Sequence, residues 1–282
     1  MPDLEIRLLV SAAAMEGIED LQAEIWPGSQ VDIVPTHVLL TAAHNGGLVL
    51  GAFQDGHMVG MLFGFPGLDQ TDLGLRIKHC SHMLGVLPVF RNSGLGFALK
   101  ARQRDLLLRQ GLDYVTWTFD PLLSRNAWLN IHRLGAVCNT YMRAEYGPMR
   151  DALNAGVESD RFQVDWWLSS TRVASRMEST YKSNSLHLKD LQSAQVKVIA
   201  AGAGMHPPQS PITLDASELL VEIPPDFQAM KGSDLPLARD WRVATRIIFE
   251  QTFSSNMVVT DFLFENGRGF YLLGTKNSHM QD

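Results

Sequence analysis

Cysteines, long apolar runs and positive charge are all scarce in this sequence of 282 residues. Cys80 and Cys138 are its only cysteines, too few for a disulfide framework and without the CxxC spacing of metal sites, so we expect two reduced thiols. No segment approaches the ~18 consecutive apolar residues of a membrane-spanning helix. The first residues, MPDLEIRLLV, lack the basic start of a secretory signal. We therefore expect a cytoplasmic protein with no membrane partner.

Charge of either sign is also scarce, since only 19% of the residues are Asp, Glu, Lys or Arg. The formal net charge is −6, and no cluster of Lys and Arg offers a footprint for a nucleic-acid backbone. We therefore expect no nucleic-acid partner. The hydrophobic fraction of 45% supports a substantial core. So few charges also allow part of the surface to be covered by a second copy, and a homodimer is one expectation.

The spacing of the apolar residues predicts alternating helices and strands, which is typical of an α/β protein. Residues 12–25 and 35–44 have helical spacing. Asp55-Gly56 between two apolar runs predicts a β-hairpin. Ser93 is a candidate N-cap for a helix that ends at Gly111. Further strands are predicted at 77–86, 112–119, 136–147 and 161–168, and a further helix at 124–135.

The composition divides the chain into three parts. Residues 1–168 contain the elements above and are predicted to form the first domain. Residues 169–212 are rich in polar residues, and we interpret them as a connecting segment with a short strand at 196–200. Residues 213–282 are predicted as strand, helix, strand and strand. This C-terminal extension is too small to bury itself well, so we expect it to pack on the first sheet or to extend it.

A glycine-rich corner, RNSGLG at 91–96, lies between the strand at 77–86 and the helix that follows it. A helix N-terminus presents unpaired N–H groups and a partial positive charge, and glycine lets an anion approach the backbone. The dinucleotide fingerprint would need a third glycine where Leu99 stands, and the Gly-Lys-Ser/Thr of a P-loop is absent. The corner alone therefore leaves a phosphate site and a purely structural turn open.

The surroundings of this corner resemble the GNAT superfamily of acyl-CoA N-acyltransferases. Residues 91–96 match the Q/R-x-x-G-x-G/A signature of that family, and the order of the predicted elements over 5–168 is similar. The resemblance implies a mixed, mostly antiparallel sheet flanked by helices, in a longer bacterial subgroup with a C-terminal extension. It also implies that an acyl-CoA is the co-substrate.

The same resemblance implies backbone contacts with coenzyme A. Leu84, Gly85 and Val86 at the strand end would pair with the pantetheine arm like another strand. The N–H of Val86 would polarise the thioester carbonyl, and Asn126 is a further candidate contact. The pyrophosphate would be held by the corner backbone, at Arg91, Asn92, Ser93, Gly94, Leu95 and Gly96.

Direct acyl transfer needs a neutral amine, so a base must remove a proton. Side chains alternate along a strand, which places His79 and His82 on opposite faces and does not favour a metal site; we expect no metal. His82 lies where a GNAT pattern with two histidines on this strand has its second one, and Cys80 replaces the first. We interpret His82 as the candidate base, with a structural histidine as the alternative. The alternation predicts one face with Cys80, His82, Leu84 and Val86.

The leaving thiolate must regain a proton, and GNAT enzymes usually employ a tyrosine of the helix after the fifth strand. Ile131 stands at that place in this chain. Tyr141, on the next predicted strand, is our candidate acid, provided that this strand bends inward.

The sequence therefore predicts an N-acyltransferase that moves an acetyl or longer acyl group, such as succinyl, from coenzyme A to the amine of a small molecule such as an amino acid. Two alternatives stay open. The first is a non-catalytic acyl-CoA-binding or sensing protein on the same scaffold, which Ile131 favours. The second is an interaction module in which the glycine corner is only a tight turn.

Overall fold

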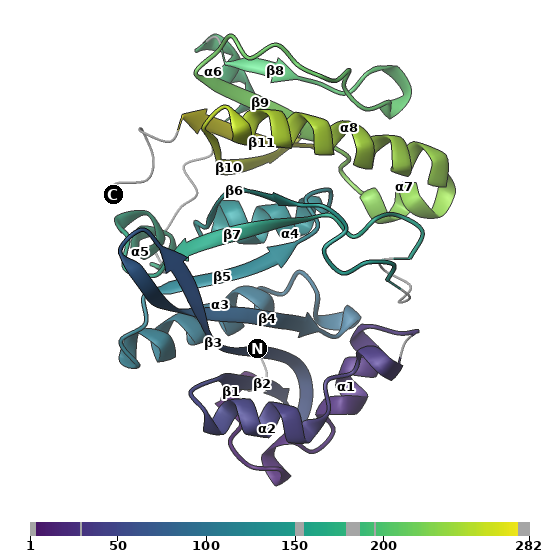
Figure 1. The fold of residues 1–282 in the computed structure, drawn as a ribbon. Helices are drawn as coiled ribbons and strands as arrows, with labels where there is room; N and C mark the ends of the chain where they lie inside the picture. Colours follow the sequence, from purple (N-terminus) through teal and green to yellow (C-terminus); the bar gives the residue numbers. More distant parts are fainter. Residues whose placement is uncertain (1–3, 29, 150–154, 179–186, 195, 276–282) are drawn as a thin grey trace. The chain divides into compact units, whose positions relative to one another are not determined.

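The computed structural model describes residues 4–28, 30–149, 155–178, 187–194 and 196–275 (Figure 1). Its contacts divide the chain into two compact units, Met1–Trp117 with Arg150–Leu153 and Thr118–Met149 with Asn154–Asp282. The division falls inside residues 1–168, and the domain boundaries at 168 and 212 stay a prediction from composition.

The first unit is built on a sheet with the strand order β1-β2-β3-β4-β5. β1 to β4 pair antiparallel, and β5 pairs parallel to β4. The predicted hairpin at Asp55-Gly56 is confirmed, and these two residues have φ values of 50° and 81°. The strands are β1 (Leu4–Leu8), β2 (Leu48–Gln54), β3 (His57–Thr71), β4 (Gly74–Val86) and β5 (Tyr114–Phe119), of which Thr118 and Phe119 belong to the second unit.

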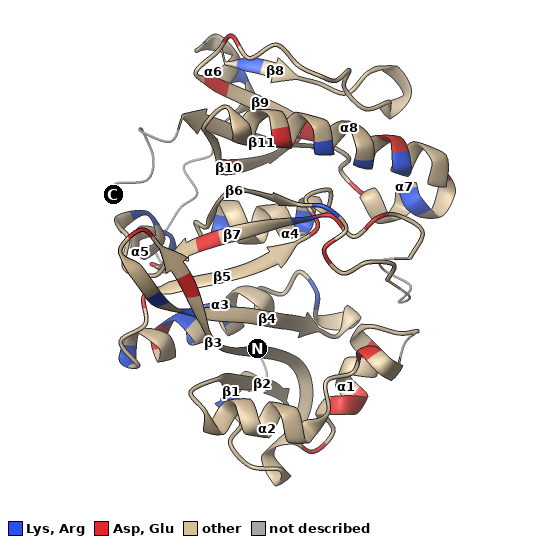
Figure 2. Ribbon diagram, viewed as in Figure 1, with Lys and Arg blue, Asp and Glu red and all other residues tan. Residues whose placement is uncertain are grey.

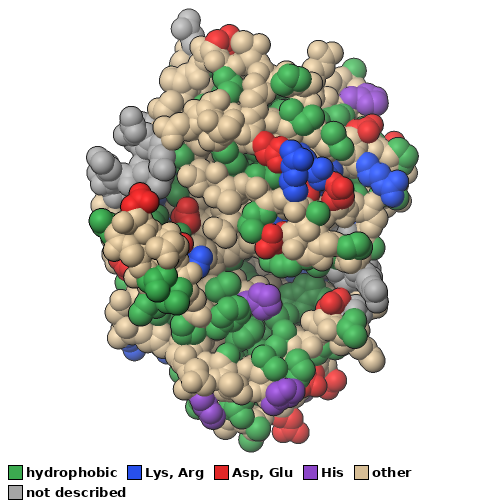
Figure 3. All heavy atoms as spheres, viewed as in Figure 1, with side chains coloured by type: hydrophobic (Ala, Val, Ile, Leu, Met, Phe, Trp, Pro, Cys, Tyr) green, Lys and Arg blue, Asp and Glu red, His purple; other side chains and the backbone are tan. Residues whose placement is uncertain are grey.

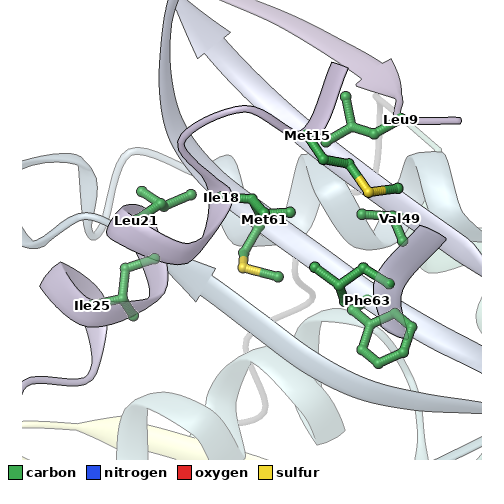
Figure 4. Close-up of a cluster of buried hydrophobic side chains, with 9 residues drawn as sticks. Leu9, Met15, Ile18, Leu21, Ile25, Val49, Met61 and Phe63 are labelled. Atoms are coloured by element: carbon green, nitrogen blue, oxygen red, sulfur yellow. The ribbon is translucent and has the colours of Figure 1, made fainter. Parts of the chain in front are cut away.

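Helices cover both faces of this sheet. α1 (Ile18–Ile25) and α2 (Thr36–His44) pack on one face, where Leu39 of α2 belongs to the same cluster as Val49 and Met61. Figure 4 shows the apolar side chains of α1 in this cluster. α3 (Leu95–Arg109) packs on the other face, where it contacts Leu50 and Leu62. Because Leu50 and Leu62 follow directly after Val49 and Met61 in their strands, the two clusters lie on opposite sides of the sheet. The cluster in Figure 4 contains Leu9, Met15, Ile18, Leu21, Ile25, Val49, Met61 and Phe63.

The helix predicted at 12–25 is shorter in the structure. Gly17 has φ of 78° and precedes α1, while Ala13–Met15 form a separate 3₁₀ turn. A left-handed residue cannot lie inside an α-helix, so the helix does not continue through Gly17 even though the apolar residues on both sides of it keep a helical spacing.

α1 approaches β4 closely at Gly85. A Cβ at this glycine would lie 2.6 Å from the Trp26 ring and 2.9 Å from Ile25 Cδ1. Any larger residue would push the end of α1 off the strand. Gly85 therefore fixes how α1 sits over the last residues of β4.

The second unit contains strands in the order β7-β6-β10-β11-β9-β8. Neighbours pair antiparallel except β8 and β9, which are parallel. Val259 pairs with Cys138 of β6, so the C-terminal strands continue the sheet that contains β6 and β7. The strands are β6 (Val137–Met142), β7 (Arg161–Trp167), β8 (Lys197–Ile199), β9 (Glu218–Ile223), β10 (Met257–Glu265) and β11 (Arg268–Thr275). The helices are α4 (Ser124–Ala127), α5 (Thr171–Met177), α6 (Leu188–Ser193), α7 (Phe227–Ser233) and α8 (Leu235–Ser254).

Aromatic packing and paired charges hold α8 on this sheet. The rings of Phe162 and Phe249 are 4.7 Å apart, and Tyr271 lies 5.4 Å from each. Charges of both signs occur along α8 (Figure 2), and Arg246 Nε lies 2.8 Å from Asp160 Oδ2. Both units thus have a mixed, mostly antiparallel arrangement of strands flanked by helices, which confirms the predicted fold class.

Candidate functional site

β4 and β5 are paired over only a short stretch. The parallel pairs are His79 with Val115 and Cys80 with Thr116. Beyond them, the ladder partners of Met83–Val86 among the described residues lie on β3. The edge of β4 that faces the β5 side is therefore available to another extended partner over this stretch.

The register of β4 with β3 decides which backbone groups point to that edge. The N–H of Leu87 donates to Val59 O at 3.0 Å, and Val86 lies opposite Gly60. In an antiparallel ladder this makes Val86 a non-hydrogen-bonded position, so its own N–H and C=O point away from β3. Leu84, two residues earlier, has the same orientation, whereas Gly85 turns its groups toward β3.

A β-bulge interrupts β4 just before this edge. Phe63 lies opposite Met83 and Phe65 lies opposite Cys80. One residue, Gly64, therefore faces both Ser81 and His82. Such a bulge re-aims the side chains that follow it.

Because of this bulge, the prediction that His82 shares one face of the strand with Leu84 and Val86 is wrong. Leu84 and Val86 pack in the cluster under α3. The His82 ring instead lies against Phe63 and Phe65, and Phe63 belongs to the cluster on the α1–α2 face. His82 and Leu84 therefore lie on opposite faces, because the extra residue shifts the alternation by one.

In the corner between β4 and α3, the space beside the backbone of Gly94 is open. Gly94 has φ of 86°, a conformation that suits glycine, and a Cβ there would meet no atom within 4 Å. The first hydrogen bond of α3 runs from Ala98 N to Gly94 O. The amides of Leu95 and Gly96 precede it, in the turn where a helix offers them no carbonyl. This geometry suits an anion.

Gly94, rather than the predicted Ser93, is the N-cap of α3. The hydroxyl of Ser93 donates to Phe90 O at 2.7 Å, at the end of a 3₁₀ turn formed by Pro88–Phe90. Asn92 has φ of 65° and turns the chain there. Because the cap is a glycine, no capping side chain occupies the space in front of the first amides of the helix.

His82 lines a pocket of about 530 Å³ between α2, β3 and β4. Its ring centroid lies 5.9 Å from that of Phe63 and 5.8 Å from that of Phe65. Figure 3 shows hydrophobic side chains gathered over this part of the first unit. Burial lowers the pKa of His82, so its imidazole is neutral near pH 7 and can accept a proton.

A buried polar cluster that sequence analysis missed lies on the opposite face of β4, under α3. Lys100 Nζ donates to Ser81 Oγ at 2.8 Å and lies 3.6 Å from the centre of the Trp117 ring. Gln103 Nε2 also donates to Ser81 Oγ, at 3.1 Å. Burial holds the pKa of Lys100 well below its usual range. Ser81 directly follows the last β4–β5 pair, so this cluster lies at the end of the β4–β5 ladder.

The predicted acid and one predicted coenzyme contact belong to the second unit. The Tyr141 hydroxyl donates to Asp160 Oδ2 at 2.7 Å. Burial, assisted by the nearby Asp160 charge, raises the pKa of Tyr141. Asn126 lies in α4 and is half-buried. Both assigned roles stay predictions.

Ile131 is fully buried in a π-helical turn formed by Trp128–Arg133, within the segment predicted as a plain helix. Beside it, His132 Nδ1 lies 2.9 Å from Asp261 Oδ1, and Arg176 Nη2 donates to Asp261 Oδ2 at 2.9 Å. These three residues are far apart in the sequence, and no local pattern links them. The position at which the resemblance implies a tyrosine thus holds a buried apolar side chain.

The residues that the structure describes contain no group of three or more His, Cys, Asp or Glu side chains that could hold a metal ion. Among the described helices, none combines the length and the apolar character needed to cross a membrane.

Comparison with solved structures finds acetyltransferases of the GNAT family. The ribosomal-protein-S18-alanine N-acetyltransferase from Escherichia coli is 15% identical with a TM-score of 0.45, over 64% of this chain and 99% of that one. A GNAT acetyltransferase from Streptococcus pneumoniae is 14% identical with a TM-score of 0.45, over 58% and 99%. One from Elizabethkingia anophelis, with acetyl-CoA bound, is 12% identical with a TM-score of 0.44, over 59% and 99%.

No family model matches this chain, and no curated protein matches its sequence.

Proposed function

We propose that this protein is an acyl-CoA-dependent N-acyltransferase. It transfers an acetyl or longer acyl group, such as succinyl, to the amine of a small molecule such as an amino acid. The proposal is supported by two features of one unit: the end of β4 has no strand partner on its β5 side among the described residues, and the N-terminus of α3 is open. The outward groups of Leu84 and the outward N–H of Val86 suit an amide-bearing arm, while Val86 O accepts from Arg91 Nε at 3.5 Å. The amides of Leu95 and Gly96 suit a diphosphate.

The chemistry proposed for the site is direct transfer. His82 accepts a proton from the ammonium group of the acceptor. The neutral nitrogen attacks the thioester carbonyl, an N–C bond forms and the C–S bond breaks. The nitrogen loses a second proton as it becomes an amide, and this balances the proton that the leaving thiolate takes up. The outward N–H of Val86 is suited to donate to the oxyanion that develops on the carbonyl oxygen.

Two measurements test this proposal. Calorimetry with coenzyme A should show saturable binding to the purified full chain. Thiol release should exceed background with acetyl-CoA or succinyl-CoA when a panel of small amines is supplied. Absence of coenzyme A binding would refute the proposal and favour the reading of the glycine corner as a turn alone.

A non-catalytic acyl-CoA sensor is the second candidate, because the buried Ile131 offers no hydroxyl at the place where the family has its acid. Under this candidate, acyl-CoA binds but no amine in the panel promotes thiol release. Turnover with any amine would exclude it. The predicted acid Tyr141 is tested by Tyr141→Phe, which should lower kcat without weakening coenzyme A binding.

A cytoplasmic location and a homodimer stay predictions. Sedimentation equilibrium of the full chain checks the second of these. A mass that stays at one chain over a wide concentration range would contradict the homodimer.

A further inference from the structure

The walls of the pocket beside His82 come from two sheet strands and one helix. β3 and β4 contribute the rings of Phe63, Phe65 and His82, and α2 contributes Val38 and Ala42. Phe65 and Val38 are large apolar residues that stay 36% and 42% exposed. Such exposed apolar side chains around a hollow mark a surface suited to an apolar ligand. A volume of about 530 Å³ falls in the range of small-molecule sites.

The polar side chains of this pocket are mostly engaged. Thr41 Oγ1 donates to His37 O at 2.8 Å, and Asn45 Nδ2 donates to Thr41 O at 2.7 Å. Both bonds run back to the α2 backbone. The titratable side chains among the described lining residues are then His37 and His82.

A fixed charge is missing from the described walls of the pocket. No Lys, Arg, Asp or Glu lines it, and α2 has no such residue along its length (Figure 2). A carboxylate that enters this pocket would lose water without gaining a cation, which is costly. The amine, unlike the carboxylate, becomes neutral there by giving its proton to His82. An apolar group would gain free energy roughly in proportion to the area that it buries, about 25 cal/mol per Å².

We propose that this pocket binds the apolar part of the acceptor, and that the acceptor class is an amine attached to a ring-sized apolar group and lacking a carboxylate. The inference rests on the proposed function for the role of His82. The amine then lies at the His82 end, and the apolar group lies between Val38 and Phe65. Amino acids are disfavoured relative to the amines that correspond to them without the carboxylate.

Matched pairs of acceptors test this inference. 2-Phenylethylamine is compared with phenylalanine, and 3-methylbutylamine with leucine, by thiol release from acetyl-CoA. Each amine should have a kcat/KM at least ~10-fold above that of its amino acid, equivalent to about 1.4 kcal/mol. Equal or greater use of the amino acids would overturn the inference while leaving the acyltransferase function intact.

A second arm tests the pocket without turnover. Calorimetry should show that 2-phenylethylamine binds to the protein alone and that Val38→Trp, which fills the pocket, weakens this binding at least ~10-fold. Val31→Trp is the matched control, because Val31 is 81% exposed and lies outside the pocket. Unchanged binding in Val38→Trp would overturn the inference. Absence of coenzyme A binding would instead refute the acyltransferase function, whatever the amine does.

Discussion

At the scale of single residues, His82 is the proposed base that takes a proton from the acceptor amine. We expect His82→Gln to lower kcat/KM by roughly 10²–10⁴-fold, the usual contribution of a positioned base. In the wild type, kcat/KM should rise with pH through a pKa below the ordinary 6.5 of histidine, because burial lowers the pKa of His82. The variant should lack this rise. His57→Gln, at an exposed histidine, is the control. If kcat/KM of the His82→Gln variant rose with pH in the same way, His82 would not be the base.

His79 is a buried histidine that makes the stability of the fold depend on pH. It is fully buried, and neither ring nitrogen has a hydrogen-bond partner among the described residues. Burial, and then the nearby Lys100, lowers the pKa of His79 from 6.5 to about 3. Between these values the unfolded chain binds one more proton than the folded chain, so acid destabilises the fold. Above pH 6.5 this contribution to stability is complete and constant.

The expected loss for the His79 imidazole is about 2 kcal/mol of unfolding free energy between pH 6.5 and pH 5. Urea denaturation at several pH values measures it. His79→Met, which keeps an apolar side chain of similar length, should lose this part of the pH dependence. His57→Met should keep it. An unchanged pH dependence in His79→Met would show that the imidazole is not held neutral.

At the scale of elements, the N-terminus of α3 is tested by adding a charge. Ser93→Asp places a carboxylate in front of amides that are proposed to hold a diphosphate. A carboxylate near a helix N-terminus does not harm the helix, so the melting temperature should change little. The dissociation constant for coenzyme A should rise roughly tenfold at low salt and less at high salt, because salt screens the repulsion. Ser93→Asn is the neutral control. Equal affinity in both variants would argue against an anion at this corner.

The packing of α3 on the sheet carries a prediction of its own. The pKa of Lys100 is depressed because the amine is buried, so folding at pH 7 opposes its protonation. Lys100→Met should therefore be more stable than the wild type at pH 7. The difference should shrink as the pH rises toward the ordinary value of 10.5. Ser81 and Gln103 still bond to each other in this variant. Thermal melts of both proteins at pH 7 and pH 9.5 measure this difference in stability. A Lys100→Met variant that is less stable than the wild type at pH 7 would contradict the prediction.

Helices and strands that depend on local sequence signals could be predicted. Asp55-Gly56 is a turn signal and Pro35 marks the start of a helix, and the hairpin and α2 lie where they were predicted. The bulge opposite Gly64 depends on how β3 meets β4, so alternation alone placed the faces wrongly after His82. β1 was missed because Leu4–Leu8 is a short edge strand with exposed charges. The polar cluster under α3 left one signal, since Lys100 and Gln103 fall on the helix face that also carries Leu99 and Leu107.

On the scale of the molecule, only the backbone part of the candidate site could be predicted from the sequence. The glycine corner at Gly94 was predicted from one short motif. The pocket beside His82 needs α2 to lie against Phe63 and Phe65, and no motif encodes that contact. Its charge-free walls became visible only in the fold, and they narrow the expected acceptor from any small amine to an apolar one.

Within the second unit, segments far apart in the chain are joined by a buried ion pair. Arg242 of α8 is 2% exposed, and its Nη2 lies 2.5 Å from Asp120 Oδ2. The Nε and Nη1 of Arg242 have no hydrogen-bond partner among the described residues. Asp120 also accepts the N–H of Leu122 at 2.9 Å. The pair therefore connects the predicted C-terminal extension to the residues that follow β5.

Removal of one member of this pair should destabilise the second unit strongly. Arg242→Met leaves the Asp120 carboxylate buried without its main cation, and we expect a loss of about 3–5 kcal/mol in the free energy of unfolding. Urea denaturation followed by tryptophan fluorescence measures it. Arg239→Met, at an exposed arginine of the same helix, should change stability by less than ~1 kcal/mol. The double variant Asp120→Asn with Arg242→Met should recover a large part of the loss, because it removes the unpaired charge while an amide oxygen can still accept from Leu122. If the double variant were as unstable as Arg242→Met alone, packing of the arginine stem rather than its charge would hold α8 in place.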